Sequence, residues 1–250
     1  MRGDLLSNHC HIVLHIVVLA FQDDFSAQVK AVGEVGADLT ALLKQQWSAK
    51  LAQQKKNLTS AQSSLSKKIP AQGAAALDGL NKVEAKIVAN LTVFVKQQSE
   101  QASQIVKDYD SLLKARLFCQ TSASTEEAAI HNIRNKSQSI VNSWVPELSQ
   151  IHQDAHEVFE STVRQIANTT ASKISDHLVA DQTRVAVTEA GVQLLNILVQ
   201  EQNDDTALLT NKQIGLFNDY LQKAETVLIK LLVAAKSKSS QSAPTKKSAE

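Results

Sequence analysis

Two histidines in the middle of the chain have the spacing of a metal-binding pair. His152 and His156 are four residues apart, so on a helix both imidazoles can face one ion. Asp154 lies on a different side of such a helix, and only Glu157 is close to the second histidine. The glutamate that follows the first histidine in zinc proteases is missing, and no third ligand is evident. We therefore expect no metal site and interpret the pair as exposed side chains.

Motifs for nucleotide binding or covalent catalysis are missing from the sequence. It contains no glycine-rich dinucleotide or phosphate loop and no GxSxG turn. No pair of carboxylates is flanked by aromatic residues, as in sites that cleave sugars. We predict a protein that is not an enzyme and has no cofactor. Adjacent acids suit helix starts, where the dipole favours anions; they occur at Asp23–Asp24, Glu126–Glu127 and Asp204–Asp205.

Residues 1–20 have the features of a secretory signal peptide. Arg2 precedes an apolar run from Ile12 to Phe21, and Val18 with Ala20 fits the small-residue rule for cleavage. The run is shorter than the roughly 20 apolar residues that span a bilayer, so we expect a secreted protein without a transmembrane helix. The alternatives are a misassigned start or a buried first helix. An uncleaved segment would leave an intracellular coiled-coil scaffold.

Four N-x-S/T sequons support export. They begin at Asn57, Asn90, Asn135 and Asn168. Such triplets accept glycans when they lie on the surface of an exported protein. Together with the signal peptide, they predict a glycoprotein.

Cysteine chemistry is limited to one residue once the signal peptide is removed. Cys10 would leave with that peptide, which makes Cys119 the remaining thiol. Leu117 and Phe118 beside it favour burial. An oxidising compartment also permits a bond between two chains. We expect either a monomer with a buried thiol or a disulfide dimer through Cys119.

Composition limits the fold that positions these residues. The 250 residues are 43% hydrophobic, 20% charged and 4% aromatic, with 7 Gly, 3 Pro and 2 Cys. This apolar content excludes a mostly disordered chain. The few glycines and prolines argue against an all-β protein, and two cysteines exclude a disulfide-dense scaffold. A net charge of +1 gives no support for nucleic-acid binding.

Apolar residues recur at steps of three, four and seven from residue 25 onward, which predicts long amphipathic helices. The first should end at Ile69–Pro70, because proline disfavours a helical residue before it. The second should end near Cys119. The third should begin with a capping box in which Ser124 is the N-cap and Glu127 reaches back to it.

Further breaks are expected in the second half of the chain. Pro146 predicts a kink or short break at Ser143–Pro146, and Asn168–Ser172 is a second weak point. A fourth helix should cover about Thr183–Gln202, and Asn203–Thr206 should break it before a last helix that ends near Ala235. The apolar stripe of the fourth helix is predicted to contain Val185, Val192, Leu195 and Val199.

The apolar pattern follows a period of 3.6 residues better than a strict heptad. We therefore predict an all-α fold, an elongated bundle of long antiparallel amphipathic helices, in preference to a parallel coiled coil. The predicted organisation is a signal peptide at 1–20, a helical bundle at 21–235 and a disordered basic tail at 236–250. The tail lysines could touch an anionic surface, but a solvated tail explains them better, because runs of like charge are often just tails.

The stretch from Ser60 to Leu91, SAQSSLSKKIPAQGAAALDGLNKVEAKIVANL, resembles insect apolipophorin III and other exchangeable apolipoproteins in composition. The resemblance extends over about Phe25 to Ala235. It implies a helix bundle that opens to lay its apolar faces on lipid. The chain departs from that pattern in its longer helices, its irregularly placed prolines, its sequons and its basic tail.

Two functions of different classes follow from these features. The first is a secreted, non-enzymatic glycoprotein that exchanges contacts between helices for contacts with lipid or another apolar surface. The second is a secreted structural or protein-binding bundle that never opens. The side chains predicted to contact lipid in the first case, all of which core packing would also explain, are Val29, Leu43, Trp47, Leu91, Phe94, Trp144, Leu195 and Phe217.

Overall fold

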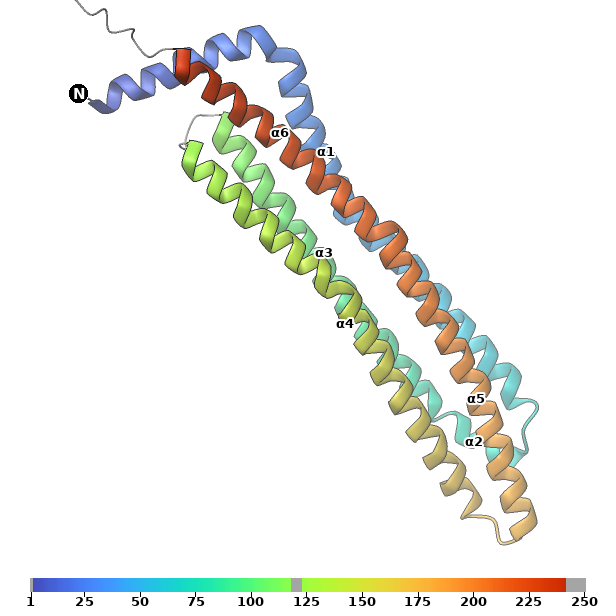
Figure 1. Cartoon of the computed structure of the whole chain (residues 1–250). Helices are drawn as coiled ribbons and strands as arrows, with labels where there is room; N and C mark the ends of the chain where they lie inside the picture. The colour runs from blue at the N-terminus through green and yellow to red at the C-terminus, as the bar shows by residue number, and fades with distance from the viewer. Residues whose placement is uncertain (1, 118–122, 242–250) are drawn as a thin grey trace, which may run out of the picture. The chain divides into compact units, whose positions relative to one another are not determined.

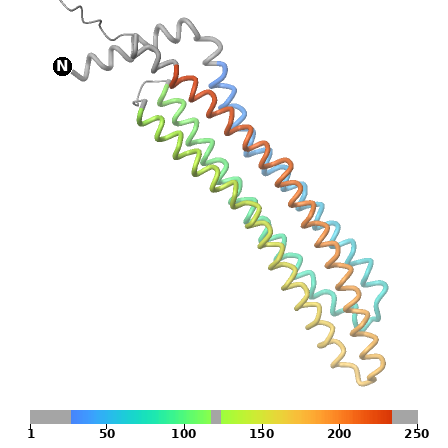
Figure 2. Tube along the Cα trace, viewed as in Figure 1, coloured from blue at the N-terminus to red at the C-terminus, as the bar shows by residue number. Residues whose placement is uncertain are grey.

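The computed structural model describes the backbone of residues 2–117 and 123–241 and the side chains of residues 27–116 and 124–233. Its long helices pack as a bundle, which confirms the predicted all-α fold (Figure 1). The chain reverses direction between α1 and α3 and again between α4 and α5 (Figure 2). The elements are α1 (Arg2–Ser66), α2 (Ala71–Leu77), α3 (Leu80–Leu117), α4 (Ala123–Ala171), α5 (His177–Leu208), the π-helix η1 (Leu209–Gln213) and α6 (Ile214–Gln241).

The chain divides into two compact units, each made of segments from several helices. Unit 1 comprises Met1–Ala41, Glu100–Ile140 and Gly215–Glu250, and unit 2 comprises Leu42–Ser99 and Val141–Ile214. Unit 1 draws on α1, α3, α4 and α6. Unit 2 draws on α1, α2, α3, α4, α5 and η1.

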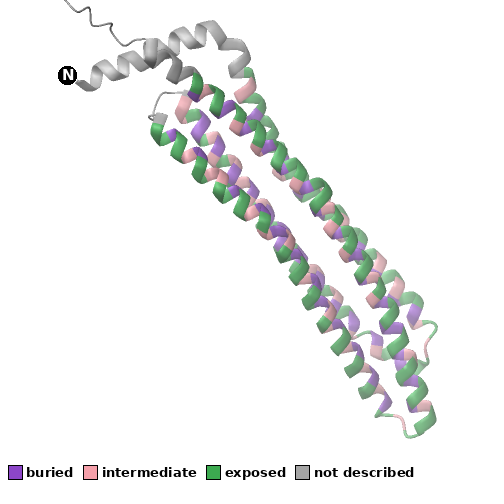
Figure 3. Cartoon of the chain, in the orientation of Figure 1, coloured by how far each residue is buried: buried purple, intermediate pink, exposed green. Residues whose placement is uncertain are grey.

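Buried positions along the helices repeat every eleven residues. In α3 this series is Leu80, Leu91, Ala102 and Leu113, and each of these side chains is buried. Eleven residues in three turns correspond to about 3.67 residues per turn, close to the 3.6 of an undistorted helix. Buried residues are coloured purple in Figure 3. The same spacing links Val32, Leu43, Gln54 and Leu65 in α1 and Glu126, Ser137, Leu148 and Phe159 in α4.

Two predicted helix ends are confirmed. Helix α1 ends at Ser66, shortly before Ile69–Pro70, and α2 begins directly after the proline. Helix α4 ends at Ala171, inside the predicted weak point. The next helix then has a good N-cap, because Asp176 Oδ1 accepts hydrogen bonds from the backbone N–H groups of Leu178 and Val179 at 2.8 and 3.1 Å.

The structure has no break at two other positions where one was expected. Helix α4 runs through Pro146 without ending, which excludes the short break and leaves the alternative of a kink as a prediction. The proline is exposed, and the buried Trp144 and Leu148 on either side pack α4 into the bundle, which offsets the missing hydrogen bond. Asn203–Thr206 also stays helical, and α5 continues through η1 into α6. The acids there form contacts between helices instead of capping a new one.

The predicted stripe of the fourth helix is also wrong. Helix α5 begins at His177, six residues before the predicted start, and Val185, Val192 and Val199 on it are exposed. Its buried face carries other aliphatic residues, including Val187, Ala190, Leu194 and Leu198. Both faces are aliphatic, so periodicity alone could not identify the buried one.

Several predictions fall at the edges of the described chain. Helix α6 ends at Gln241, so it extends six residues into the segment predicted to be a tail, and 242–250 lie outside the described residues. Cys119 also lies outside them. Helix α1 begins at Arg2, and the side chains of residues 1–26, including Cys10, lie outside the described part.

Candidate functional site

An apolar groove lies between α1 and α6 in unit 1. Its volume is about 440 Å³. The buried side chains of Val32, Tyr220 and Val227 form its floor, and the exposed Ala31 and Val35 extend the apolar surface along α1. Polar groups lie on the exposed side of the lining: Gln28, Asp219, Gln222, Lys223 and Thr226.

The helices approach closely beside the groove. A Cβ atom on Gly36 would lie 2.7 Å from Val106 Cγ1 and 3.1 Å from Tyr220 Cε2, so only glycine fits there. The ring of Tyr220 packs edge-on against Tyr109, with 6.3 Å between the ring centroids. Burial raises the pKa of Tyr109 to about 12, and burial also raises the pKa of Tyr220. Both phenols therefore stay neutral.

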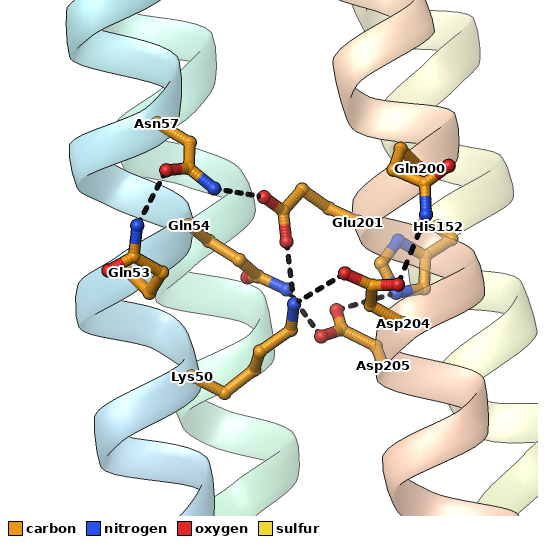
Figure 4. Close-up of polar contacts among 9 residues, drawn as sticks. All are labelled: Lys50, Gln53, Gln54, Asn57, His152, Gln200, Glu201, Asp204 and Asp205. Atoms are coloured by element: carbon orange, nitrogen blue, oxygen red, sulfur yellow. Dashed lines mark hydrogen bonds and ion pairs between the residues drawn. The ribbon is translucent and has the colours of Figure 1, made fainter.

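A cluster of charged and amide side chains lies inside unit 2, between α1 and α5. Lys50 Nζ lies 2.9 Å from Glu201 Oε2 and 3.1 Å from Asp204 Oδ2 (Figure 4). Burial lowers the pKa of Lys50, but its hydrogen bonds to the two carboxylates outweigh burial and leave that pKa raised. Asn57 Nδ2 donates to the other oxygen of Glu201 at 2.8 Å. Glu201 is thus a buried acid with a partner on each oxygen.

The same cluster reaches α4 through Asp205, which is completely buried. Gln54 donates a hydrogen bond to Asp205 Oδ1, and His152 Nε2 lies 3.1 Å from Asp205 Oδ2 without the alignment of a hydrogen bond (Figure 4). His156 is half-buried. Burial is the main cause that lowers its pKa, and the electrostatic effect of His152 lowers that pKa further. The expectation of two exposed histidines is therefore wrong, because α5 covers this side of α4.

A layer of amide side chains lies in the core of unit 2 near the end of α5. Trp47 Nε1 donates to Gln98 Oε1 at 2.8 Å and to Gln213 Oε1 at 2.5 Å. Gln98 also donates to Gln213, at 3.1 Å. Gln213 reaches this layer from the π-helix η1. These partners explain how Gln98 can be buried in the core although it carries an amide.

The eight side chains predicted to contact lipid lie mainly in the core. Val29 and Leu195 are half-buried, and the structure brings together Trp47 and Phe94, whose rings meet edge-on at 5.9 Å. Phe217 packs against Tyr220 in unit 1. The fully buried members of the set are Leu43, Trp47, Leu91, Phe94, Trp144 and Phe217.

Three of the four sequon asparagines have exposed side chains, namely Asn90, Asn135 and Asn168. Asn57 is half-buried, and its Nδ2 atom, the atom to which a glycan would be joined, donates to Glu201. The side-chain amide of Asn57 is therefore less accessible to a glycan than those of the other three asparagines. Sequence spacing alone could not make this distinction.

Within residues 2–117 and 123–241, no helix is long and apolar enough to cross a bilayer. Over the same part of the chain, His, Cys, Asp and Glu side chains form no group of three or more placed to hold a metal ion. Comparisons with models of known protein families, with curated proteins and with solved structures found no match to this chain.

Proposed function

We propose that this protein is a non-enzymatic binding protein that takes a single-chain amphiphile into the groove between α1 and α6. The observation that carries this proposal is the groove itself, whose volume of about 440 Å³ lies in the range of small-molecule sites. Its floor is apolar and its polar groups lie at the rim, the arrangement that suits a hydrocarbon chain with a polar head. From Gln28 to Val35 the lining spans roughly 10 Å of helix, which suits one medium-length chain.

Export and glycosylation belong to the same proposal. The exposed asparagines Asn90, Asn135 and Asn168 could accept glycans without any change in packing. Glycosidase treatment and N-terminal sequencing of the natural protein test this part. We expect a mass shift and a start near residue 21.

A groove-filling substitution tests ligand binding. Ala31 is exposed and lines the groove, whereas Ala37 is exposed on the same helix outside it. We expect a fluorescent medium-chain acyl probe to bind the wild type saturably. The probe should bind Ala31→Phe at least about tenfold more weakly and Ala37→Phe as tightly as the wild type. Absence of saturable binding to the wild type would overturn the proposal.

A closed, protein-binding bundle is the second candidate, and the buried polar cluster favours it. Opening unit 2 would strip Glu201 and Asp205 of Lys50, Asn57 and Gln54. Mixing the protein with phosphatidylcholine vesicles distinguishes a bundle that opens on lipid from one that stays closed. Vesicle clearance with a gain of helicity supports opening, whereas unchanged vesicles and helicity support a bundle that stays closed.

A further inference from the structure

Charge is distributed very unevenly within unit 2. Its segment 42–99, which includes parts of α1 and α3, contains nine lysines, no arginine and two acids, Asp78 and Glu84, for a net charge of +7. Its segment 141–214, which includes parts of α4 and all of α5, contains ten acids and four lysines or arginines, for a net charge of −6. The net charge of +1 for the whole chain therefore conceals a basic and an acidic part of the same unit.

The basic segment forms one side of unit 2. Its two long helices lie together, since Trp47 of α1 donates to Gln98 of α3 and Thr59 of α1 donates to Glu84 of α3 at 3.4 Å. Figure 4 shows α1 and α3 on one side of the polar cluster and α4 and α5 on the other. We use the term lysine face for six exposed lysines of this side that have no ion pair within the described residues, namely Lys44, Lys56, Lys67, Lys68, Lys82 and Lys86.

Folding of the chain does not explain the lysine face. Lys50, which does join two helices, is half-buried and pairs with two carboxylates of α5. Lys82 and Lys86 are one turn apart on α3, and like charges at that spacing destabilise a helix. Exposed charges on the other side of unit 2 include local pairs of opposite sign, such as Glu160 with Arg164. Unpaired cations over two helices therefore indicate a surface that attracts an anionic partner.

The residue types of segment 42–99 argue against a nucleic acid as that partner. Arginine is the side chain that binds phosphates and guanine with two parallel hydrogen bonds, and this segment has none. Bases of single strands stack on exposed aromatic rings. The two aromatic residues of the segment, Trp47 and Phe94, are buried in the core.

The curvature of the lysine face favours a flexible polymer over a flat bilayer. Lys44 and Lys56 are twelve residues apart, which places them about 120° apart around α1. Lys67 follows Lys56 after eleven residues and continues its row. A plane that touches one row leaves the other in solution, whereas a flexible chain can reach both. Segment 42–99 also exposes just two large aliphatic side chains, Leu42 and Val93, which are too few to anchor these helices in lipid.

We propose that the lysine face binds a linear sulfated polysaccharide that lies along α1 and α3. From Lys44 to Lys67 the face extends over roughly 35 Å, so its six lysines match a polymer with about one anion every 6 Å. Sulfate groups give a polysaccharide this charge density, whereas carboxylates alone place the anions further apart. The proposal is independent of amphiphile binding, because the α1–α6 groove belongs to unit 1 and the lysine face to unit 2.

Calorimetric titration of the full chain with heparin at several salt concentrations tests the proposal. The chain is first treated with glycosidase, because a glycan at Asn90 would lie one turn from Lys86. We expect saturable binding that weakens steeply with salt, since each lysine that meets a sulfate releases counterions. The double variant Lys82→Gln/Lys86→Gln should bind at least about tenfold more weakly and depend less on salt. It removes a like-charge pair and should therefore fold.

Two double variants with the same change in charge are the controls. Lys173→Gln/Lys212→Gln alters exposed lysines of segment 141–214, on the other side of unit 2. Lys246→Gln/Lys247→Gln alters the C-terminal segment. Both should bind heparin as tightly as the wild type. The proposal fails if the wild type does not bind heparin, or if the three double variants lose affinity equally.

Three further measurements distinguish the class of partner. Hyaluronan, whose anions are all carboxylates, should bind much more weakly than heparin, and equal binding would contradict a preference for sulfate. Phosphatidylserine vesicles that bind through Lys82 and Lys86 more tightly than heparin does would replace the polysaccharide with a membrane. Self-association at low salt that Lys82→Gln/Lys86→Gln abolishes, without heparin binding, would identify the acidic side of a second copy as the partner.

Discussion

At the scale of single residues, the acids near the end of α5 show what local sequence leaves open. Asp204 and Asp205 stand next to each other and looked like the start of a new helix. Asp205 is buried and accepts from Gln54, which lies 151 residues away in sequence, and Asp204 binds Lys50. These acids do not start a new helix, because their carboxylates have better partners on another helix. No local pattern contains those partners.

Removing the carboxylate of Asp205 should destabilise the protein strongly. Asp205→Ala leaves the buried amide of Gln54 without its acceptor and removes the anion beside His152. We expect a loss of about 2–3 kcal/mol in the free energy of unfolding, measured by urea titration. The neighbouring Asp204 is half-exposed, so Asp204→Ala should cost about 0.5 kcal/mol. Equal losses in the two variants would contradict the assigned role of the cluster.

His156 should make stability depend on pH. Burial lowers its folded-state pKa below the ordinary value of 6.5, so the unfolded chain takes up a proton first as the pH falls. Stability is then present at neutral pH and declines as the pH drops through 6.5. His156→Gln should flatten this decline in urea titrations at neutral and mildly acidic pH. His131→Gln, at an exposed position of the same helix, should retain it.

At the scale of helices, periodicity predicted most of the architecture. The few glycines and prolines and the steps of three and four residues identified long helices and most of their buried faces. They could not choose between the two aliphatic faces of α5, since the face with Val187 and Leu194 is buried through contacts with distant helices. The α1–α6 groove could not be predicted from periodicity either, because it depends on how two segments nearly 200 residues apart in sequence approach each other.

Two glycines of α1 should respond in opposite directions to alanine. A Cβ on Gly33 meets nothing within 4 Å, so Gly33→Ala should raise stability by about 0.5–1 kcal/mol through helix propensity. A Cβ on Gly36 would overlap Val106, so Gly36→Ala should lower stability by about 1–3 kcal/mol. The two residues lie three positions apart on one helix, so each variant serves as the control for the other when their thermal unfolding is compared. A gain in stability for Gly36→Ala would contradict the close approach of α1 to Val106.

At the scale of the whole molecule, the two compact units are built from different segments of the same long helices. Helices α1, α3 and α4 each contribute to both units, and α5, η1 and α6 form one continuous helical stretch. Interruption of α1, α3 or α4 at the boundary between the units removes hydrogen-bonded turns from both units. Helix formation is cooperative along the backbone, so the two units should lose their structure together.

The aromatic residues allow this coupling to be measured without any substitution. Both tryptophans, Trp47 and Trp144, lie in unit 2, and both tyrosines, Tyr109 and Tyr220, lie in unit 1. We expect tryptophan fluorescence and the NMR signals of the tyrosine rings to give the same urea midpoint. Each ring reports its own surroundings, so separate midpoints would mean that one unit melts while the other stays folded. In that case the shared helices would unfold at the boundary between the two units, and the stability of one unit would not depend on the other.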